Sequence, residues 1–120
     1  MQKEVLEKNS ALHIDVYAIW FSMLPGDSPA AFPMARQLMP DHRVIHFWDK
    51  SKVAGSWFKE NITPDYGGKI MWDAYYLYGS EAEWYKIPQP LISWGRTIME
   101  KRQELLSEIR LLAVKDVSSR

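Results

Sequence analysis

The hydrophobic positions of this chain follow two periods, one typical of β-strands and the other of α-helices. Stretches rich in β-branched and aromatic residues predict strands at residues 12–22, 43–48, 70–78 and 84–86. Both faces of the first stretch become apolar after Val16, which is typical of a central strand covered on both sides. The last two stretches predict a hairpin that turns between them.

Three other stretches carry apolar residues at helical spacing. The first begins at Ser28, a hydroxyl N-cap that is followed by Pro29 at the first helical position, and runs to about residue 38. Asp49 or Ser51 can cap the second helix. The third is a long C-terminal helix, predicted at about residues 91–114.

These elements follow one another in the order β-α-β-α-β-β-α. A right-handed crossover makes the first two strands parallel neighbours, so the hairpin lies on the other side of the first strand. We therefore predict an α/β fold with a four-stranded mixed sheet, in the order 2-1-3-4, and helices on both faces. Residues 1–10 are a polar lead-in, and residues 11–120 are predicted to form a single domain with an extended C-terminal helix.

The composition limits the chemistry. The chain has no cysteine, which excludes disulfides, thiolate nucleophiles and Cys-ligated metals. Its 15 basic and 15 acidic residues argue against a binder of nucleic acid, which usually carries a basic excess. No stretch is long enough to span a membrane, and residues 1–10 lack the apolar core of a signal peptide. We expect a soluble protein and leave cytoplasm and periplasm open.

The turn between the first strand and the first helix carries a family resemblance. A strand containing Trp20 leads through "SMLPGDSP" into a helix that contains Pro33. This organisation resembles the active-site turn of the thioredoxin family, and the similarity covers about residues 11–112. The resemblance implies a thioredoxin-like fold in which Pro25 and Ser28 occupy the places of the two redox cysteines. The cis-proline of the family is absent as well. The resemblance therefore implies the fold of the family without its thiol–disulfide exchange.

Individual polar residues offer other chemistry, each with a simpler structural explanation. Ser28 is a candidate nucleophile at a helix N-terminus, but no base is placed beside it and an N-cap explains it equally. Asp27 is either a turn residue or a catalytic acid. His13 and Asp15 share a strand face about 7 Å apart, which leaves a weak two-ligand metal site open.

The remaining histidines and aspartates also allow more than one interpretation. His42 and His46 would lie about 13 Å apart on one strand face, which is too far to bind one metal. A pair of carboxylates such as Asp15 and Asp73 could perform general acid–base work, or could be hydrogen-bonded at strand ends. We expect neither a metal nor a cofactor. Left without an assigned role are His42, His46, Asp49 and Asp73.

We expect a non-redox binding module for a protein or peptide. Its predicted ligand surface consists of Met23, Leu24, Pro25, Gly26, Asp27, Ser28 and, from the neighbouring loop, Tyr66. The apolar stripe with Leu105, Ile109 and Leu112 on the last helix either packs on its own domain or pairs with a second copy in a homodimer. The alternative is a non-thiol enzyme that uses carboxylate and histidine side chains in a cleft near residues 23–28. The six Trp, six Tyr and four Phe either fill the core or form a binding surface.

Overall fold

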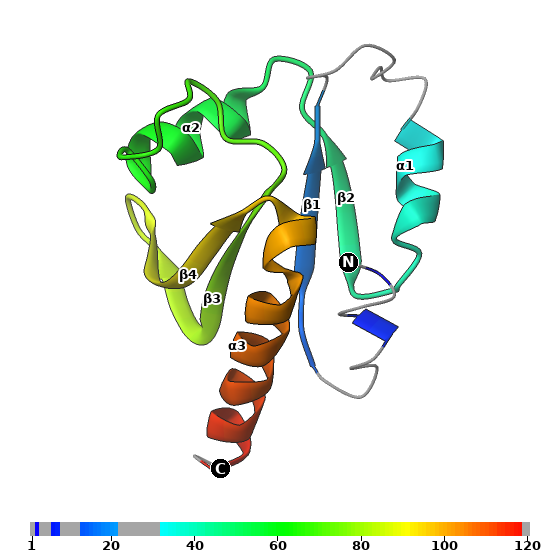
Figure 1. The fold of residues 1–120 in the computed structure, drawn as a ribbon, viewed down its shortest axis with the longest axis vertical. Coiled ribbons are helices and arrows are strands. Elements are labelled where there is room, and N and C mark those ends of the chain that lie inside the picture. Colours follow the sequence, from blue (N-terminus) through cyan, green and yellow to red (C-terminus); the bar gives the residue numbers. More distant parts are fainter. Residues whose placement is uncertain (1, 3–5, 8–12, 22–31, 119–120) are drawn as a thin grey trace. The chain divides into compact units, whose positions relative to one another are not determined.

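Strands and helices alternate along the first half of the chain, and a hairpin and a long helix follow (Figure 1). The computed structural model describes residues 2, 6, 7, 13–21 and 32–118. Its elements are β1 (Val16–Trp20), α1 (Phe32–Leu38), β2 (Val44–Trp48), α2 (Val53–Asn61), β3 (Ala74–Trp84), β4 (Pro88–Arg96) and α3 (Ile98–Ser118). The chain is therefore α/β, as the sequence predicts.

The strands do not form one sheet. Strand β1 pairs in parallel with β2, and β3 pairs antiparallel with β4; within the described residues these are two separate two-stranded sheets. The predicted four-stranded mixed sheet in the order 2-1-3-4, with helices on both its faces, is therefore wrong, and so is the thioredoxin-like fold that depends on it. The described chain divides into two compact units, one with β1, α1, β2 and α2, the other with β3, β4 and α3.

The start of the expected third strand is bound to helix α2 instead of to a strand. The amide of Met71 donates a hydrogen bond to the carbonyl oxygen of Gly55 at 3.0 Å. Glycine permits this approach, because a β carbon at Gly55 would lie 2.7 Å from the carbonyl oxygen of Met71. Asp73 then turns the chain with a φ of 49°, in the left-handed region. Strand β3 consequently begins at Ala74, and residues 70–73 are not part of it.

The hairpin is longer than the sequence predicts. Trp84 lies opposite Pro88, so the chain reverses at residues 85–87 and not at residues 79–83. Leu91 and Trp94 have helical spacing, which led to the prediction of a helix from residue 91. In the structure, burial alternates residue by residue from Leu91 to Gly95, as in a strand with one covered face. Helix α3 therefore begins at Ile98.

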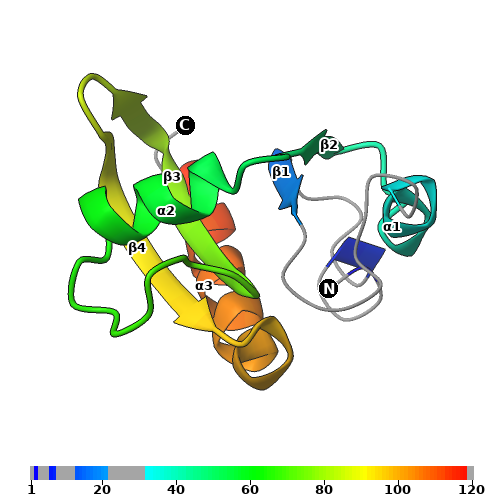
Figure 2. The ribbon, with the colours of Figure 1, turned by 90° about the horizontal axis from the view of Figure 1, so that it is seen from above.

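Helix α3 covers one face of the hairpin, as Figure 2 shows. Its side chains Leu105, Leu106 and Ile109 are buried. Burial, and then the nearby carboxylates of Glu108 and Glu104, raise the pKa of Tyr75 on β3. Tyr75 therefore lies on the covered face, beside the helix.

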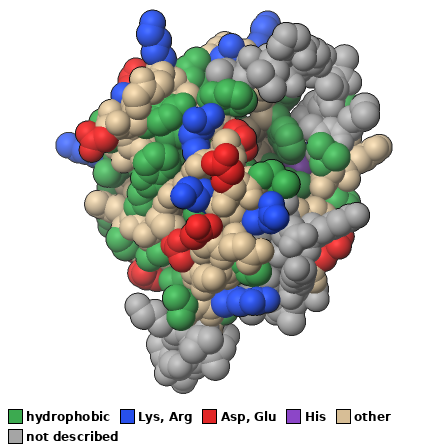
Figure 3. Space-filling model, viewed as in Figure 1, with side chains coloured by type: hydrophobic (Ala, Val, Ile, Leu, Met, Phe, Trp, Pro, Cys, Tyr) green, Lys and Arg blue, Asp and Glu red, His purple; other side chains and the backbone are tan. Residues whose placement is uncertain are grey.

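Charges of both signs are interspersed on the face shown in Figure 3, where blue and red side chains lie among green ones. This distribution agrees with the equal numbers of acidic and basic residues in the sequence. Among the helices of the described residues, none combines the length and the apolar character that crossing a bilayer requires.

Candidate interaction surface

The β1–β2 pair exposes a cluster of apolar side chains on one side. In the parallel register of the two strands, Tyr17 lies opposite Ile45 and Ile19 lies opposite Phe47. Because alternate residues of a strand point to the same side, these four side chains form one face. Their exposed fractions are 62%, 49%, 40% and 48%, in the order named. We call this set of four residues the outward face.

The two aromatic rings of the outward face are in contact. Tyr17 and Phe47 lie diagonally across the pair, with ring centroids 6.5 Å apart and an interplanar angle of 29°. Diagonal neighbours in a sheet are within reach of aromatic side chains. Both residues nevertheless remain about half exposed. The outward face is thus an organised apolar surface and not a set of scattered exposed residues.

The opposite side of the pair is covered and holds His46. The indole Nε1 of Trp20 donates to Nδ1 of His46 at 2.9 Å, and the planes of the two rings are 18° apart. Nε2 of His46 lies 3.0 Å from the carbonyl oxygen of Met39. With both ring nitrogens bonded, His46 holds β2 to β1 and to the end of α1.

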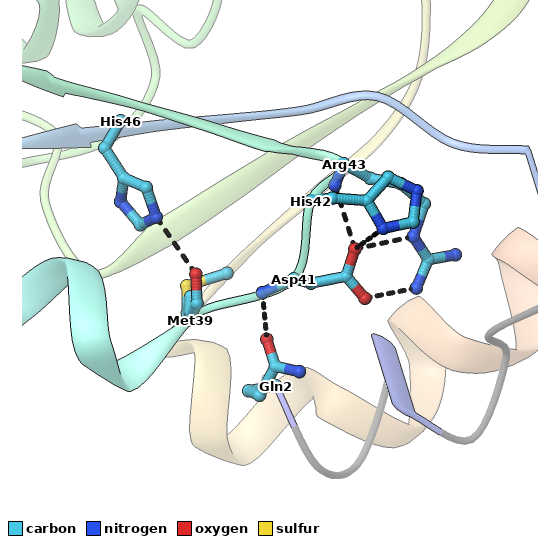
Figure 4. Close-up of polar contacts among 6 residues, drawn as sticks. All are labelled: Gln2, Met39, Asp41, His42, Arg43 and His46. Atoms are coloured by element: carbon cyan, nitrogen blue, oxygen red, sulfur yellow. Dashed lines mark hydrogen bonds and ion pairs between the residues drawn. The ribbon is translucent and has the colours of Figure 1, made fainter.

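A second polar network holds the turn that leads into β2 (Figure 4). Nε of Arg43 donates to Oδ1 of Asp41 at 2.9 Å, a second guanidinium nitrogen contacts Oδ2 at 2.6 Å, and the backbone amide of Arg43 also donates to Oδ1. These bonds hold the pKa of the Asp41 carboxyl far below its ordinary value, and the same pairing raises the pKa of Arg43. Oε1 of Gln2 accepts the backbone amide of Asp41, and exposed His42 lies 3.9 Å from its carboxylate. The hydrogen bonds of Asp41 therefore stabilise the turn before β2.

Two of the aspartates considered in the sequence analysis, Asp49 and Asp73, also accept backbone hydrogen bonds. Oδ2 of Asp49 accepts the amide of Ala54 at 2.7 Å, in the first turn of α2. Oδ1 of Asp73 accepts the amide of Ile98 at 3.3 Å, where α3 begins. Both aspartates therefore satisfy amides that have no partner inside their helices. His13 and Asp15 are exposed.

The structure places only part of the predicted ligand surface. Its members Met23, Leu24, Pro25, Gly26, Asp27 and Ser28 lie outside the described residues. Tyr66 is half-buried, and its amide donates to the carbonyl oxygen of Thr63 at 3.1 Å. A β carbon at Gly68 would lie 2.6 Å from the ring of Tyr66, so the ring covers this glycine. Whether Tyr66 takes part in binding stays a prediction.

The predicted interaction stripe of the last helix lies on α3. Leu105 and Ile109 are 3% and 7% exposed within a single chain, and Leu112 is half-buried. Of the two alternatives for this stripe, these exposures favour packing on its own unit.

Groups that could hold a metal or a small ligand are not brought together in the described part of the chain. It contains no cluster of three or more histidine, aspartate or glutamate side chains that could bind a metal ion. A shallow depression on α3, lined by Gln103, Glu104, Ser107 and Glu108, is open to solvent. All four residues come from one helix surface, so no second element encloses a ligand there.

Sequence reasoning missed the outward face. Residues 17, 19, 45 and 47 all read as apolar strand positions, and the first strand was expected to be covered on both sides. The sequence does show that these four residues are apolar and lie in strands. Their exposure could not be predicted, because it depends on β1 and β2 forming a pair of their own.

Comparison of the chain with protein-family models, with curated proteins and with solved structures finds no match. The resemblance to the thioredoxin family therefore stays a prediction.

Proposed function

We propose that this chain is a protein-binding module and that its outward face receives an apolar surface of a partner protein. The observation that carries the proposal is the exposure of four neighbouring apolar side chains on one side of the β1–β2 pair. Parallel strands are normally covered on both faces. Clustered apolar side chains that remain exposed are typical of protein–protein contact sites.

The chemistry of the outward face favours a protein as the ligand. Its four side chains carry no charge, so they offer no cation that could pair with a phosphate or another anion. Tyr and Phe supply a large contact area while few side-chain torsions must be fixed on binding. An apolar protein surface satisfies these side chains best.

Two other arrangements have less support. A homodimer through α3 would use Leu105 and Ile109, but these side chains are already buried within one chain. Of the side chains considered for an enzyme, Asp49 caps α2 and both ring nitrogens of His46 are bonded, while the expected cleft near residues 23–28 lies outside the described residues. The observations on the outward face therefore favour binding over catalysis.

The test is to pan a phage-displayed library of random peptides against the purified chain at low surface density. We expect enrichment of peptides with several aromatic or aliphatic residues. Ile45→Thr keeps a β-branched residue in the strand and removes apolar contact area, so affinity for the enriched peptides should fall about tenfold. The matched control is Val53→Thr on α2, at a position that is 63% exposed but lies outside the outward face.

The comparison of these two variants decides the proposal. Loss of affinity in Ile45→Thr, with Val53→Thr unchanged, supports binding at the outward face. Equal affinity in both variants, or no enrichment of apolar peptides, contradicts it.

A further inference from the structure

The outward face has an internal arrangement that restricts its partner. Tyr17 and Ile45 form one cross-strand pair, and Ile19 and Phe47 form the next. The two rings thus occupy one diagonal of a two-by-two array, and the two isoleucines occupy the other. Large flat groups and smaller branched groups alternate in both directions.

This array is complementary to itself. If a second copy packs face to face about a two-fold axis along the strands, Tyr17 meets Ile45 of the other copy and Phe47 meets its Ile19. If the axis lies in the interface but across the strands, Tyr17 meets Ile19 and Phe47 meets Ile45. In each case a ring lies over an isoleucine, and rings do not compete for the same space. Sheets that pack face to face keep their strand directions within about 30° of each other, so these two axes cover the aligned packings.

The area agrees with a weak dimer. From the exposed fractions and ordinary side-chain sizes, the four residues present about 400 Å² of apolar surface per copy. Two copies would bury about 800 Å², and a homodimer interface that is about 65% apolar would then total about 1,200 Å². This total lies at the lower limit of specific, stable interfaces. The dissociation constant should consequently be in the micromolar range.

We infer that the partner of the outward face is a second copy of this chain, bound about a two-fold axis that lies in the interface. The inference rests on the proposed function, since it names the occupant of the same surface. Two-fold symmetry is the commonest arrangement of protein dimers and requires a self-complementary surface. The outward face meets this requirement with uncharged side chains alone.

The first experiment is sedimentation equilibrium of the full chain over a range from about 1 to 500 µM, which spans the weak affinities expected of a small interface. We expect a reversible monomer–dimer equilibrium. Ile45→Thr should weaken dimerisation about tenfold or more, because the residue occurs twice in the interface, whereas Val53→Thr should not change it. A wild-type chain that stays monomeric over this range overturns the inference. Peptide binding that depends on Ile45 would still support the proposed function, so the two failures are distinguishable.

The second experiment uses complementary charges. Ile45→Lys and Tyr17→Glu should each be monomeric, because each buries an unpaired charge in the dimer. Mixed in equal amounts, they should form a heterodimer if the axis runs along the strands, since the introduced lysine then faces the introduced glutamate. Ile19→Lys mixed with Tyr17→Glu should do so if the axis runs across the strands. Far-UV circular dichroism of each variant verifies folding. Heterodimer formation in either mixture supports the inference and identifies the axis; its absence in both mixtures overturns it.

Discussion

The ring of Tyr75 on β3 lies directly over Gly95 on β4. The two residues are cross-strand partners, and a β carbon at Gly95 would lie 2.8 Å from Cε1 of Tyr75. An aromatic ring thus covers the surface that the glycine leaves without a side chain. Tyr75 is half-buried, and a methyl group at Gly95 would have to displace its ring.

Gly95→Ala should destabilise the protein. Forcing an extra methyl group into a packed site costs about 1–3 kcal/mol. Replacing a glycine within a strand recovers about 0.5–1 kcal/mol of backbone entropy. We expect a net loss of about 1–2 kcal/mol in the free energy of unfolding, measured by urea denaturation.

Two controls isolate the contact. No atom lies within 4 Å of a β carbon built at Gly67, so Gly67→Ala should change stability by less than about 0.5 kcal/mol. In a Tyr75→Leu background the ring is gone, and Gly95→Ala should then cost nothing. An equal cost of Gly95→Ala with and without the ring would contradict this account.

The location of Gly95 shows which features of this chain can be predicted from its sequence. The predicted helix at about residues 91–114 would contain Gly95, since Leu91 and Trp94 are three residues apart. A short apolar stretch such as this one is compatible with a strand as well as with a helix. The contact that distinguishes the two, between Tyr76 and Trp94, joins strands that are far apart in the sequence. The order of elements depends on local signals and could be predicted. That the two expected strand pairs form separate sheets depends on contacts such as that of Met71 with Gly55, and this could not be predicted.

Stability should fall in acid because of Asp41. The hydrogen bonds from Arg43 hold the pKa of Asp41 far below the ordinary value of 3.8 that the unfolded chain retains. The unfolded state therefore binds the proton first as the pH falls. The contribution of this pair is complete above about pH 5 and is lost progressively as the pH falls below about 4 toward the folded-state pKa. Urea denaturation at a series of pH values measures the loss.

Asp41→Asn tests the assignment of this acid sensitivity. The amide cannot pair with Arg43 as a carboxylate does, so the variant should be less stable than the wild type at pH 7. The difference should narrow as the pH approaches 3, because the unfolded wild-type chain then binds a proton at Asp41 and the folded state loses its relative advantage. Asp65→Asn, in an exposed loop, controls for the loss of one negative charge. A difference that stays constant with pH would refute the role of this pair.

Asp49 should stabilise α2 as its capping residue. The residue at the N-cap position, Lys52, has a φ of 59° and makes no side-chain cap, while Asp49 accepts the amide of Ala54. Asp49→Ala should cost about 1 kcal/mol of unfolding free energy, as capping residues usually do. Asp49→Asn keeps an acceptor oxygen and should recover much of the loss. Ser51→Ala, the alternative that the sequence left open, should have little effect; a larger cost than that of Asp49→Ala would reverse the assignment.

The candidate site was harder to predict than the fold elements, again for a physical reason. The predicted ligand surface lies on a turn that resembles a known active site but lacks the two cysteines of that site. The outward face instead depends on Tyr17 and Phe47 being on the open side of a two-stranded pair. A one-residue change of strand register would turn all of these side chains to the other face. Exposure of this kind follows from tertiary pairing alone.

The bonds of His46 determine which of its ring nitrogens carries the proton. The indole nitrogen of Trp20 can only donate, so Nδ1 of His46 must accept and carries no proton. Nε2 is then protonated and donates to the carbonyl oxygen of Met39. Long-range nitrogen-15 NMR correlations of the ring should show a protonated Nε2 and an unprotonated Nδ1.

Removing the indole should release this preference. Trp20→Phe leaves Nδ1 of His46 without its donor, so the two tautomers should mix, and stability should fall by about 1 kcal/mol. Trp94→Phe removes an indole from the other unit and should leave the ring signals of His46 unchanged. A ring protonated at Nδ1 in the wild type, or one that does not respond to Trp20→Phe, would show that the Trp20–His46 hydrogen bond does not hold β1 to β2.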